Sequence, residues 1–288
     1  MSVLVRLGDY ARLMRLHRPI GIFLLMWPAL WAVWLAGAGK PNPVILAIFV
    51  AGVVLMRSAG CVINDYADRE FDPHVARTRD RPLAAGRVST AEAMTLFVIL
   101  CLISLVLVLQ LNRLTIYLSF VGLFLAVSYP FMKRYTHLPQ FYLGMAFGWA
   151  IPMAFAAELG TVPVTGWLMF AANIAWSVAY DTAYAMVDRA DDVKIGVKST
   201  AILFGTHDRT MVGVFHIIFL VLMLGVGVLA DCRLPYYIGL AAAAGLAMYE
   251  QGLIAAREPQ ACFRAFLHNN WIGAAVFAGL VVSYLVKP

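Results

Sequence analysis

Charged side chains are scarce in this 288-residue chain, in which Asp, Glu, Lys and Arg together make up 13% of the residues. Soluble globular domains carry about a quarter charged residues, so this shortage argues against an ordinary soluble protein. Apolar residues make up 62% of the sequence, and the mean hydropathy is +0.80. This composition is that of a polytopic membrane protein.

Several familiar catalytic patterns are also missing from the sequence. It contains no HExxH, P-loop or GxGxxG sequence, so zinc hydrolysis and nucleotide binding have no local support. The four cysteines show no CxxC spacing, and most lie in apolar segments, as expected of buried structural thiols. The net charge of +6 fits basic residues gathered on one side of a membrane, so we expect no nucleic-acid partner.

Nine apolar segments are long enough to cross about 30 Å of hydrocarbon, which takes about 20 helical residues. Only helices or closed barrels satisfy the backbone in lipid, and these runs lack the two-residue alternation of barrel strands. We therefore predict an all-α fold of about nine transmembrane helices in a single domain, 1–288, because no polar linker divides the chain. The segments are 19–37, 43–63, 90–111, 115–132, 139–157, 165–187, 211–230, 235–255 and 269–286.

Basic residues indicate the orientation of these segments. If the N-terminus is cytoplasmic, most Lys and Arg residues fall in cytoplasmic loops, and the opposite side keeps only Lys40, Arg113, Arg233 and Lys287. Basic and apolar residues also mix within the first 18 positions, as in an amphipathic helix that lies on membrane lipid.

Two acid-rich stretches lie at the predicted inner ends of apolar segments. Asn64, Asp68 and Asp72 recur at i, i+4 and i+8, and Asp188 and Asp192 form a matching i, i+4 pair. In helices, each set would share one face. Clustered carboxylates resist ionising together, but Mg²⁺ removes that conflict and commonly bridges one or two carboxylates to substrate phosphates. The two faces together predict a site for a diphosphate.

The two acidic stretches also suggest an internal repeat. Asp68 and Asp188 are 120 positions apart (188 minus 68), and Arg69 and Arg189 keep the same offset. We expect two quasi-repeated four-helix halves, with the ninth helix added at the end.

Shorter patterns make local predictions. Ser89-x-x-Glu92 predicts a capping box at the start of a helix, and Gly144-x-x-x-Gly148 permits close approach of two helices. Arg57 lies seven residues before Asn64 and on the same helical face, where it could serve as an interhelical charge or line a cavity.

These motifs resemble those of a known family. Asn64-Asp65-x-x-Asp68-x-x-x-Asp72 and Asp181-x-x-Tyr184-Ala185-x-x-Asp188-x-x-Asp191-Asp192 are similar to the two signature motifs of the UbiA superfamily of intramembrane prenyltransferases. The resemblance covers essentially the whole chain. Further segments resemble those of the 4-hydroxybenzoate polyprenyltransferases of ubiquinone synthesis, namely 16–21, 129–140, 179–182 and 198–201.

The resemblance implies a fold, a reaction and a location. It implies nine helices around a central cavity, two Mg²⁺ ions, and transfer of a polyprenyl group from polyprenyl diphosphate to 4-hydroxybenzoate. The new bond would form at the ring carbon ortho to the hydroxyl, with release of diphosphate. The enzyme would be integral to a bacterial inner membrane, with its active site facing the cytoplasm.

The resemblance also assigns roles to individual residues. Asn64, Asp68 and Asp72 would hold one metal ion with the diphosphate, and Asp188 and Asp192 would hold the other. The four aspartates in these sets are the implied catalytic residues. Asp65, Asp181 and Asp191 are left open between ligation and an indirect role.

Substrate contacts are expected for further basic and aromatic residues. Arg18, Lys133 and Arg134 would neutralise diphosphate oxygens or hold the aromatic carboxylate, and the sequence does not divide these tasks among them. Tyr184, together with Tyr129 and Tyr180, is a candidate for contact with an allylic cation.

Two alternatives remain open from the sequence. One is a prenyltransferase with another acceptor, such as a naphthoate, haem or a chlorophyll precursor. The other is a secondary transporter, because intramembrane acids also mark ion pathways. A transporter should carry its acids near mid-bilayer on broken helices, whereas these acids lie at segment ends beside basic loops.

The predicted orientation can be tested with topology reporters. A reporter placed after Lys40 should read external, and one placed in 73–89 should read cytoplasmic, because of the distribution of basic residues. The opposite pattern would contradict both the orientation and a cytoplasmic active site.

Overall fold

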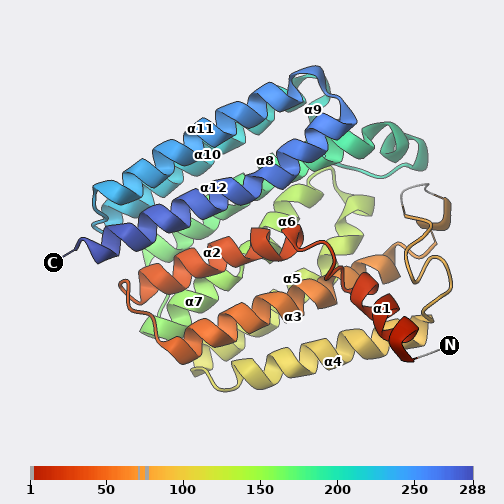
Figure 1. Cartoon of the computed structure of the whole chain (residues 1–288), viewed down its shortest axis with the longest axis horizontal. Helices are drawn as coiled ribbons and strands as arrows, with labels where there is room; N and C mark the ends of the chain where they lie inside the picture. The colour runs from red at the N-terminus through yellow and green to blue at the C-terminus, as the bar shows by residue number, and fades with distance from the viewer. Residues whose placement is uncertain (1–2, 71, 75–77, 288) are drawn as a thin grey trace.

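Long helices make up most of the chain, as shown by a computed structural model that describes residues 3–70, 72–74 and 78–287 (Figure 1). No strand occurs in this part of the chain. The longer helices are α2 (Ile20–Ala36), α3 (Pro43–Ala67), α4 (Thr90–Val108), α5 (Arg113–Tyr135), α8 (Val164–Ile195), α10 (Asp208–Leu229), α11 (Leu234–Leu253) and α12 (Pro259–Leu285). The shorter ones are α1 (Val3–Leu13), α6 (Pro139–Gly148), α7 (Ala150–Leu159) and α9 (Thr200–Phe204).

The nine predicted segments correspond to these eight long helices and to the pair α6 and α7. Among the described residues, seven helical stretches are long and apolar enough to cross a membrane, and α2 is a shorter apolar helix. The two chain termini lie at opposite ends of the bundle (Figure 1), as an odd number of crossings requires. The all-α membrane fold is therefore confirmed, while the two-half repeat stays a prediction.

Two predicted segments differ from the observed helices in ways that matter for the site. The sixth segment was expected to end at 187, but α8 continues to Ile195 and carries the second acidic stretch on its last turns. The fifth segment is broken at Trp149, between α6 and α7. Pro152 explains the break, because its missing N–H and its ring disrupt the helix across the preceding turn.

The packing of α6 on α8 depends on the two glycines predicted to allow close approach. A Cβ on Gly144 would lie 2.9 Å from Ile174 Cα, and one on Gly148 would lie 2.5 Å from Asn173 Nδ2. The gap left by these glycines lets Asn173 Nδ2 donate a hydrogen bond to the Gly144 carbonyl at 3.1 Å. The close approach is thus confirmed, and it brings the pocket-lining faces of α6 and α8 together.

Helix α1 and the start of α4 are fixed to each other at the end of the bundle. The capping box is present, with Ser89 accepting from the backbone of Glu92 and Glu92 accepting in return. Arg6 pairs with Glu92 at 2.5 Å, and Asp9 pairs with Arg87 at 3.1 Å. Leu13 is fully buried against α3 and α4, while other apolar side chains of α1 are exposed, as suits a helix at a lipid surface.

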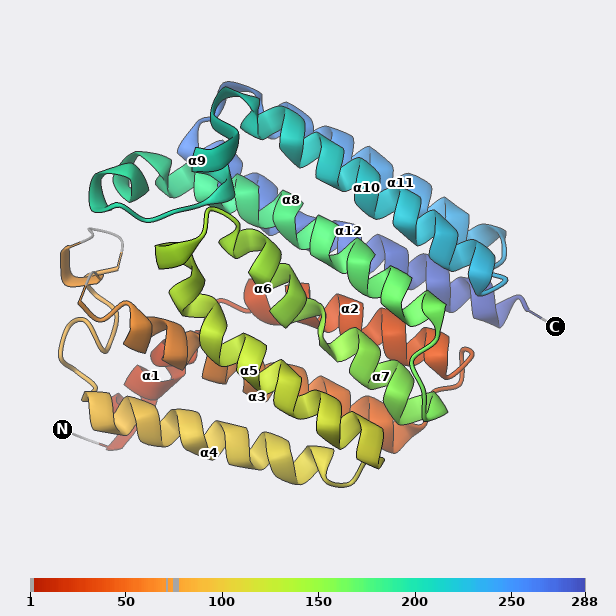
Figure 2. The same ribbon diagram turned by 180° about the vertical axis from the view of Figure 1, so that it is seen from behind.

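The helices are divided between two faces of the bundle. Helices α5, α6 and α7 lie on the face turned to the viewer in Figure 2, and α2, α3 and α12 lie on the face turned to the viewer in Figure 1. The main core is dominated by large aromatic side chains from α2, α8 and α10, among them Trp31, Trp176 and Phe219.

The contact between α6 and α8 gives a stability prediction. Gly144→Ala should lower the free energy of unfolding by about 1–3 kcal/mol, because its Cβ would press against the backbone of α8. Gly245→Ala in α11 is the matched control, since nothing lies within 4 Å of that Cβ and the change should be neutral or slightly stabilising. Melting curves in detergent measure both, and equal curves for the two variants would contradict the packing.

Candidate active site

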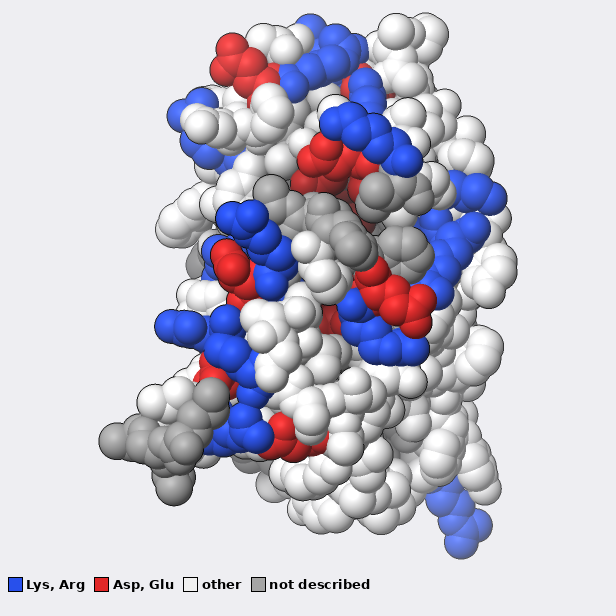
Figure 3. Space-filling view, turned by 90° about the vertical axis from the view of Figure 1, so that its right-hand side faces the viewer, with Lys and Arg blue, Asp and Glu red and all other residues white. Residues whose placement is uncertain are grey.

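A cavity of about 1070 Å³ runs along the inside of the bundle. Its polar end lies where charged side chains gather at one end of the molecule (Figure 3), and apolar side chains such as Leu105, Leu123 and Met153 line its continuation. Every residue predicted for the site lies in the wall of this one cavity, namely Arg18, Asn64, Asp68, Asp72, Lys133, Arg134, Tyr184, Asp188 and Asp192. The fold therefore brings the two acidic stretches together.

The first acidic group lies where α3 ends. Helix α3 stops at Ala67, yet the Asp68 N–H donates to the Asn64 carbonyl at 3.0 Å and the Asp72 N–H donates to the Asp68 carbonyl at 2.9 Å. These bonds keep the i, i+4 spacing across the helix end, and Asp72 itself begins a short 3₁₀ turn, Asp72–His74. The expected shared helical face is thus present at the end of α3, and the backbone bonds beyond the helix continue it to Asp72.

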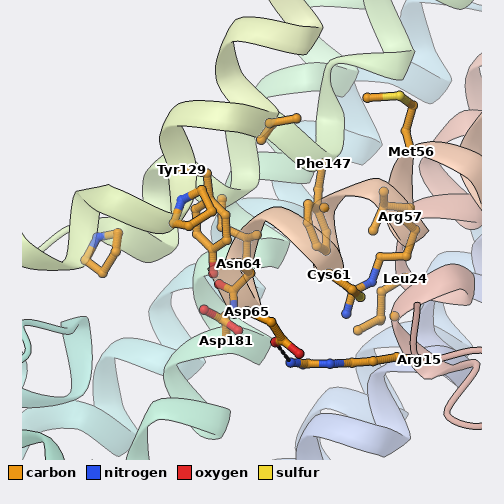
Figure 4. Close-up of a pocket in the computed structure, with 18 of the residues that line it drawn as sticks. Arg15, Leu24, Met56, Arg57, Cys61, Asn64, Asp65, Tyr129, Phe147 and Asp181 are labelled. Atoms are coloured by element: carbon orange, nitrogen blue, oxygen red, sulfur yellow. Dashed lines mark hydrogen bonds and ion pairs between the residues drawn. The ribbon is translucent and has the colours of Figure 1, made fainter. Parts of the chain in front are cut away.

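Basic side chains from other elements neutralise the first acidic group. Lys133 Nζ lies 2.5 Å from Asp68 Oδ2, and Arg81 Nη1 lies 2.7 Å from Asp72 Oδ2. Asp65 is buried and forms an ion pair with Arg15 at 2.5 Å (Figure 4). It forms a second ion pair with Arg81 at 3.2 Å. Asp65 therefore connects two arginines from different parts of the chain through ion pairs.

The second acidic group lies along α8. Asp181, Asp188, Asp191 and Asp192 all lie in the cavity wall, from inside the bundle to the last turns of the helix. The Tyr184 ring packs on Phe266 with 4.8 Å between ring centroids. This part of the wall therefore combines carboxylates with aromatic rings.

Other predicted basic residues occupy the edge of the polar end. Arg134 donates a hydrogen bond to the Ala67 carbonyl, next to the first acidic group, and its guanidinium lies over Phe131. Arg18 is exposed at the mouth of the cavity. Lys198, in the loop after α8, donates its backbone N–H to the Lys133 carbonyl at 2.9 Å, which ties the two sides of the mouth together.

Sequence reasoning missed Arg15 and Arg81 as site residues. Arg15 follows the surface helix α1, where a basic residue is expected for reasons unrelated to a site. Its φ of +56° is unusual for a residue other than glycine, and this backbone turn accompanies the contact of its side chain with Asp65. Arg81 belongs to the basic loop after the first acidic stretch. Its place in this loop is the sequence feature that could have identified it as a site residue.

The donor atoms of the site fit a hard divalent cation. Asp68 Oδ1 is buried without a hydrogen-bond partner in the described chain, and the remaining donors are carboxylate and amide oxygens. No three His, Cys, Asp or Glu side chains of the described residues form a ready-made metal site. Burial raises the pKa of Asp72, and the Arg81 guanidinium offsets part of that rise. The oxygen atoms of each acidic group thus fit part of the coordination of such a cation.

The fold and site define an intramembrane protein with paired acidic groups around a long apolar cavity, and sequence comparison identifies its family. The profile of the UbiA prenyltransferase family matches residues 25–279. This chain belongs to the UbiA prenyltransferase family.

Similar proteins agree with this assignment. The 4-hydroxybenzoate octaprenyltransferase of Methylococcus capsulatus is 62% identical over 284 residues, covering 99% of this chain and 97% of that protein. The enzyme of the same name from Nitrosococcus oceani is 60% identical, with 97% and 98% covered.

Solved structures show the same fold. A UbiA homologue from Aeropyrum pernix has a TM-score of 0.79 at 25% identity, with 90% of this chain and 97% of that chain covered. A UbiA homologue from Archaeoglobus fulgidus, bound to GPP and Mg²⁺, has a TM-score of 0.74 at 18% identity, with 96% and 100% covered.

Asp68→Asn and Asp188→Asn test the predicted metal-binding roles. Each change keeps size and hydrogen bonding but removes a charge, so turnover should fall at least ~10²-fold, or ~2.7 kcal/mol of transition-state stabilisation. Melting temperatures should stay near that of the parent. The matched control is Asp231→Asn, whose exposed carboxylate lies outside the cavity wall, 3.4 Å from Lys287. Well-folded variants with near-parent rates would refute the assignment.

Proposed function

We propose that this protein transfers a polyprenyl group from polyprenyl diphosphate to the ring carbon ortho to the hydroxyl of 4-hydroxybenzoate, a step of ubiquinone biosynthesis. The observation that carries the proposal is a single cavity with acidic and basic side chains at one end and apolar side chains along the rest. This division matches a donor with an anionic head and a long hydrocarbon chain. The names of the relatives at about 60% identity support the same acceptor.

The two acidic groups would hold divalent metal together with the diphosphate. Asn64, Asp68 and Asp72 would serve on one side and Asp188 and Asp192 on the other, and we expect two Mg²⁺ ions. When bound, Mg²⁺ supplies positive charge that stabilises the departing diphosphate. The structure of the Archaeoglobus fulgidus homologue with GPP and Mg²⁺ supports the use of such a metal within this fold.

The basic residues of the site would exchange partners when the donor binds. Lys133 and Arg81 neutralise Asp68 and Asp72 in this structure. A diphosphate with metal would take over the carboxylates and leave these two side chains to bind phosphate oxygens. Arg18 and Arg134, at the mouth of the same cavity, would add positive charge there. The charges thus remain balanced in both states.

The apolar wall would protect the reacting carbon. Once the allylic C–O bond breaks, positive charge develops on carbon, and water would quench it. Tyr129 and Tyr184 both line the cavity, and the Tyr129 hydroxyl points to the side that carries Asn64 and Asp181 (Figure 4). Ring faces in a dry pocket stabilise such a cation and exclude water. The ring carbon of the acceptor then forms the new C–C bond and loses its proton.

Arg57 provides a subsite for the acceptor carboxylate. Its Nη1 lies 3.0 Å from Cys61 Sγ and its guanidinium lies 5.8 Å from the Phe147 ring centroid. No carboxylate of the described chain forms a direct ion pair with it, although Asp181 in the same cavity wall is close enough to interact with it electrostatically. Gly21 leaves room for this side chain, because a Cβ there would lie 2.3 Å from Arg57 Nε. A guanidinium in a cavity that no carboxylate contacts directly has N–H donors left for an anionic ligand. The 4-hydroxybenzoate carboxylate fits this requirement.

Two alternatives are less well supported. A prenyltransferase for another acceptor would use the same donor site, but the names of the relatives favour 4-hydroxybenzoate. A secondary transporter should carry its acids near mid-bilayer. Asn64, Asp68 and Asp72 here lie at the end of α3, and Asp188 and Asp192 lie on the last turns of α8, around the charged end of the cavity. We further propose that the protein is integral to a bacterial inner membrane, with this end of the cavity facing the cytoplasm.

The assay that tests the function uses purified protein with labelled polyprenyl diphosphates and a panel of aromatic acids. Prenylated 4-hydroxybenzoate should form with Mg²⁺ and not in excess chelator, because oxygen donors alone favour Mg²⁺ or Mn²⁺ over Zn²⁺. Faster turnover of another aromatic acid than of 4-hydroxybenzoate would show that the protein uses a different acceptor. Full turnover in chelator would sink the metal-dependent proposal.

Arg57→Gln tests the acceptor subsite. It should raise KM for 4-hydroxybenzoate by about tenfold or more, because a hydrogen bond to a charged group contributes about 1.5–3 kcal/mol. KM for the polyprenyl diphosphate should stay within about twofold. Steady-state kinetics with each substrate varied in turn measure both values, and Arg57→Lys should be intermediate. Unchanged KM for the acceptor would exclude the subsite.

A further inference from the structure

Asp208 is a fully buried carboxylate that lies outside the cavity and joins several elements. It begins α10, and its side chain has no exposed surface. It pairs with Arg189 of α8 and, at 2.9 Å, with Arg257 at the corner before α12. Its Oδ1 also accepts the backbone N–H of Arg209 at 2.6 Å. One carboxylate therefore connects α8, α10 and the corner before α12.

The two arginines extend this connection to the loop that carries α9. Arg189 Nη2 also donates to the Ala201 carbonyl at 2.8 Å and to the Gly205 carbonyl at 3.2 Å. Arg257 Nη2 donates to the Thr206 carbonyl at 2.7 Å. Both side chains thus hold the same short segment, but only Arg189 belongs to the helix of the second acidic group.

The position of Arg189 along α8 gives the contact a functional meaning. It directly follows Asp188 and precedes Asp192 by three residues, and both aspartates line the cavity while Arg189 lies outside its wall. In this part of α8, Ala190, Asp191 and Val193 are exposed. The contact of Arg189 with Asp208 therefore fixes how the end of α8 is rotated about its axis. That rotation determines the direction in which Asp188 and Asp192 point.

The matching residue of the first acidic stretch has no such anchor. Arg69 directly follows Asp68, but its guanidinium stacks on the Tyr66 ring at 4.5 Å and pairs with the exposed Glu70 at 3.1 Å. The first group is held instead through Asp65, which binds Arg15 and Arg81. The two acidic groups are therefore held by different ion pairs, although Asp68–Arg69 and Asp188–Arg189 are adjacent pairs in both acidic stretches.

We infer that Asp208 and Arg189 are positioning residues that fix the last turns of α8 and so hold Asp188 and Asp192 in the orientation that binds metal and diphosphate. This inference rests on the proposed function. Residues that orient metal ligands without touching the metal change metal affinity by about 10–100-fold when lost. Arg257 binds the same carboxylate from the far side, so its loss should weaken the fold without turning α8.

The test compares Arg189→Gln with Arg257→Gln in the purified full-length protein. Both should lower the melting temperature in chelator, since each breaks one half of the same buried cluster. Only Arg189→Gln should raise the Mg²⁺ concentration for half-maximal activity, by about tenfold or more. It should also reduce the melting-temperature increase that Mg²⁺ with inorganic diphosphate produces, a readout that needs no turnover. Arg257→Gln should keep both at the parent values.

The following outcomes decide the inference. Equal metal responses in the two glutamine variants, or a parent-like response in both, would overturn it. If Arg189→Gln does not fold, Arg189→Lys takes its place, and a parent-like metal requirement in that variant would also overturn the inference, whereas an intermediate one supports it. An inactive parent protein would refute the proposed function, while the melting response to Mg²⁺ and diphosphate would still compare the two arginines.

Discussion

The structure depends on keeping carboxylates charged at the edge of an apolar cavity. Low-dielectric surroundings disfavour each charge, and neighbouring carboxylates disfavour one another. The protein answers with basic side chains brought from elsewhere in the sequence. Lys133 comes from the end of α5, Arg81 from the loop after the 3₁₀ turn, and Arg15 from the end of α1. These ion pairs neutralise the acidic groups in the absence of a ligand.

The same constraint fits the proposal that each acidic group supplies only part of a metal site. Mg²⁺ prefers six oxygen ligands and usually takes several of them from water or substrate phosphates. On the proposed function, two partial sites in the wall of one cavity would make metal binding depend on the diphosphate. The anionic head of the donor would then be part of the site, and its hydrocarbon chain would occupy the apolar remainder.

Much of the fold could be predicted because membrane helices depend on local composition. The long apolar runs predicted the helices, and the i, i+4 spacing predicted that Asn64 and Asp68 share a face. The continuation of α8 to Ile195 was missed because apolarity marks where a helix leaves the membrane and not where it ends. The break at Trp149 is a backbone effect of Pro152 within an apolar run, so hydropathy does not report it.

Contacts between distant segments could not be predicted from the sequence. The pairing of Asp65 with Arg15 joins residues 50 positions apart, and nothing local distinguishes Arg15 from other basic residues of a surface helix. Arg189 likewise appeared only as part of a repeated spacing, whereas the structure gives it a buried partner in Asp208. Tertiary packing decides such pairs, and a single sequence does not carry that information.

The central claim is that the acidic groups are partial metal sites which the diphosphate completes. The most direct measurement is a titration with Mn²⁺, followed by electron paramagnetic resonance, with and without a non-reactive diphosphate analogue of the donor. The account predicts weak binding of Mn²⁺ alone and much tighter binding with the analogue present. Tight binding of Mn²⁺ without any diphosphate, or no increase when the analogue is added, would contradict it.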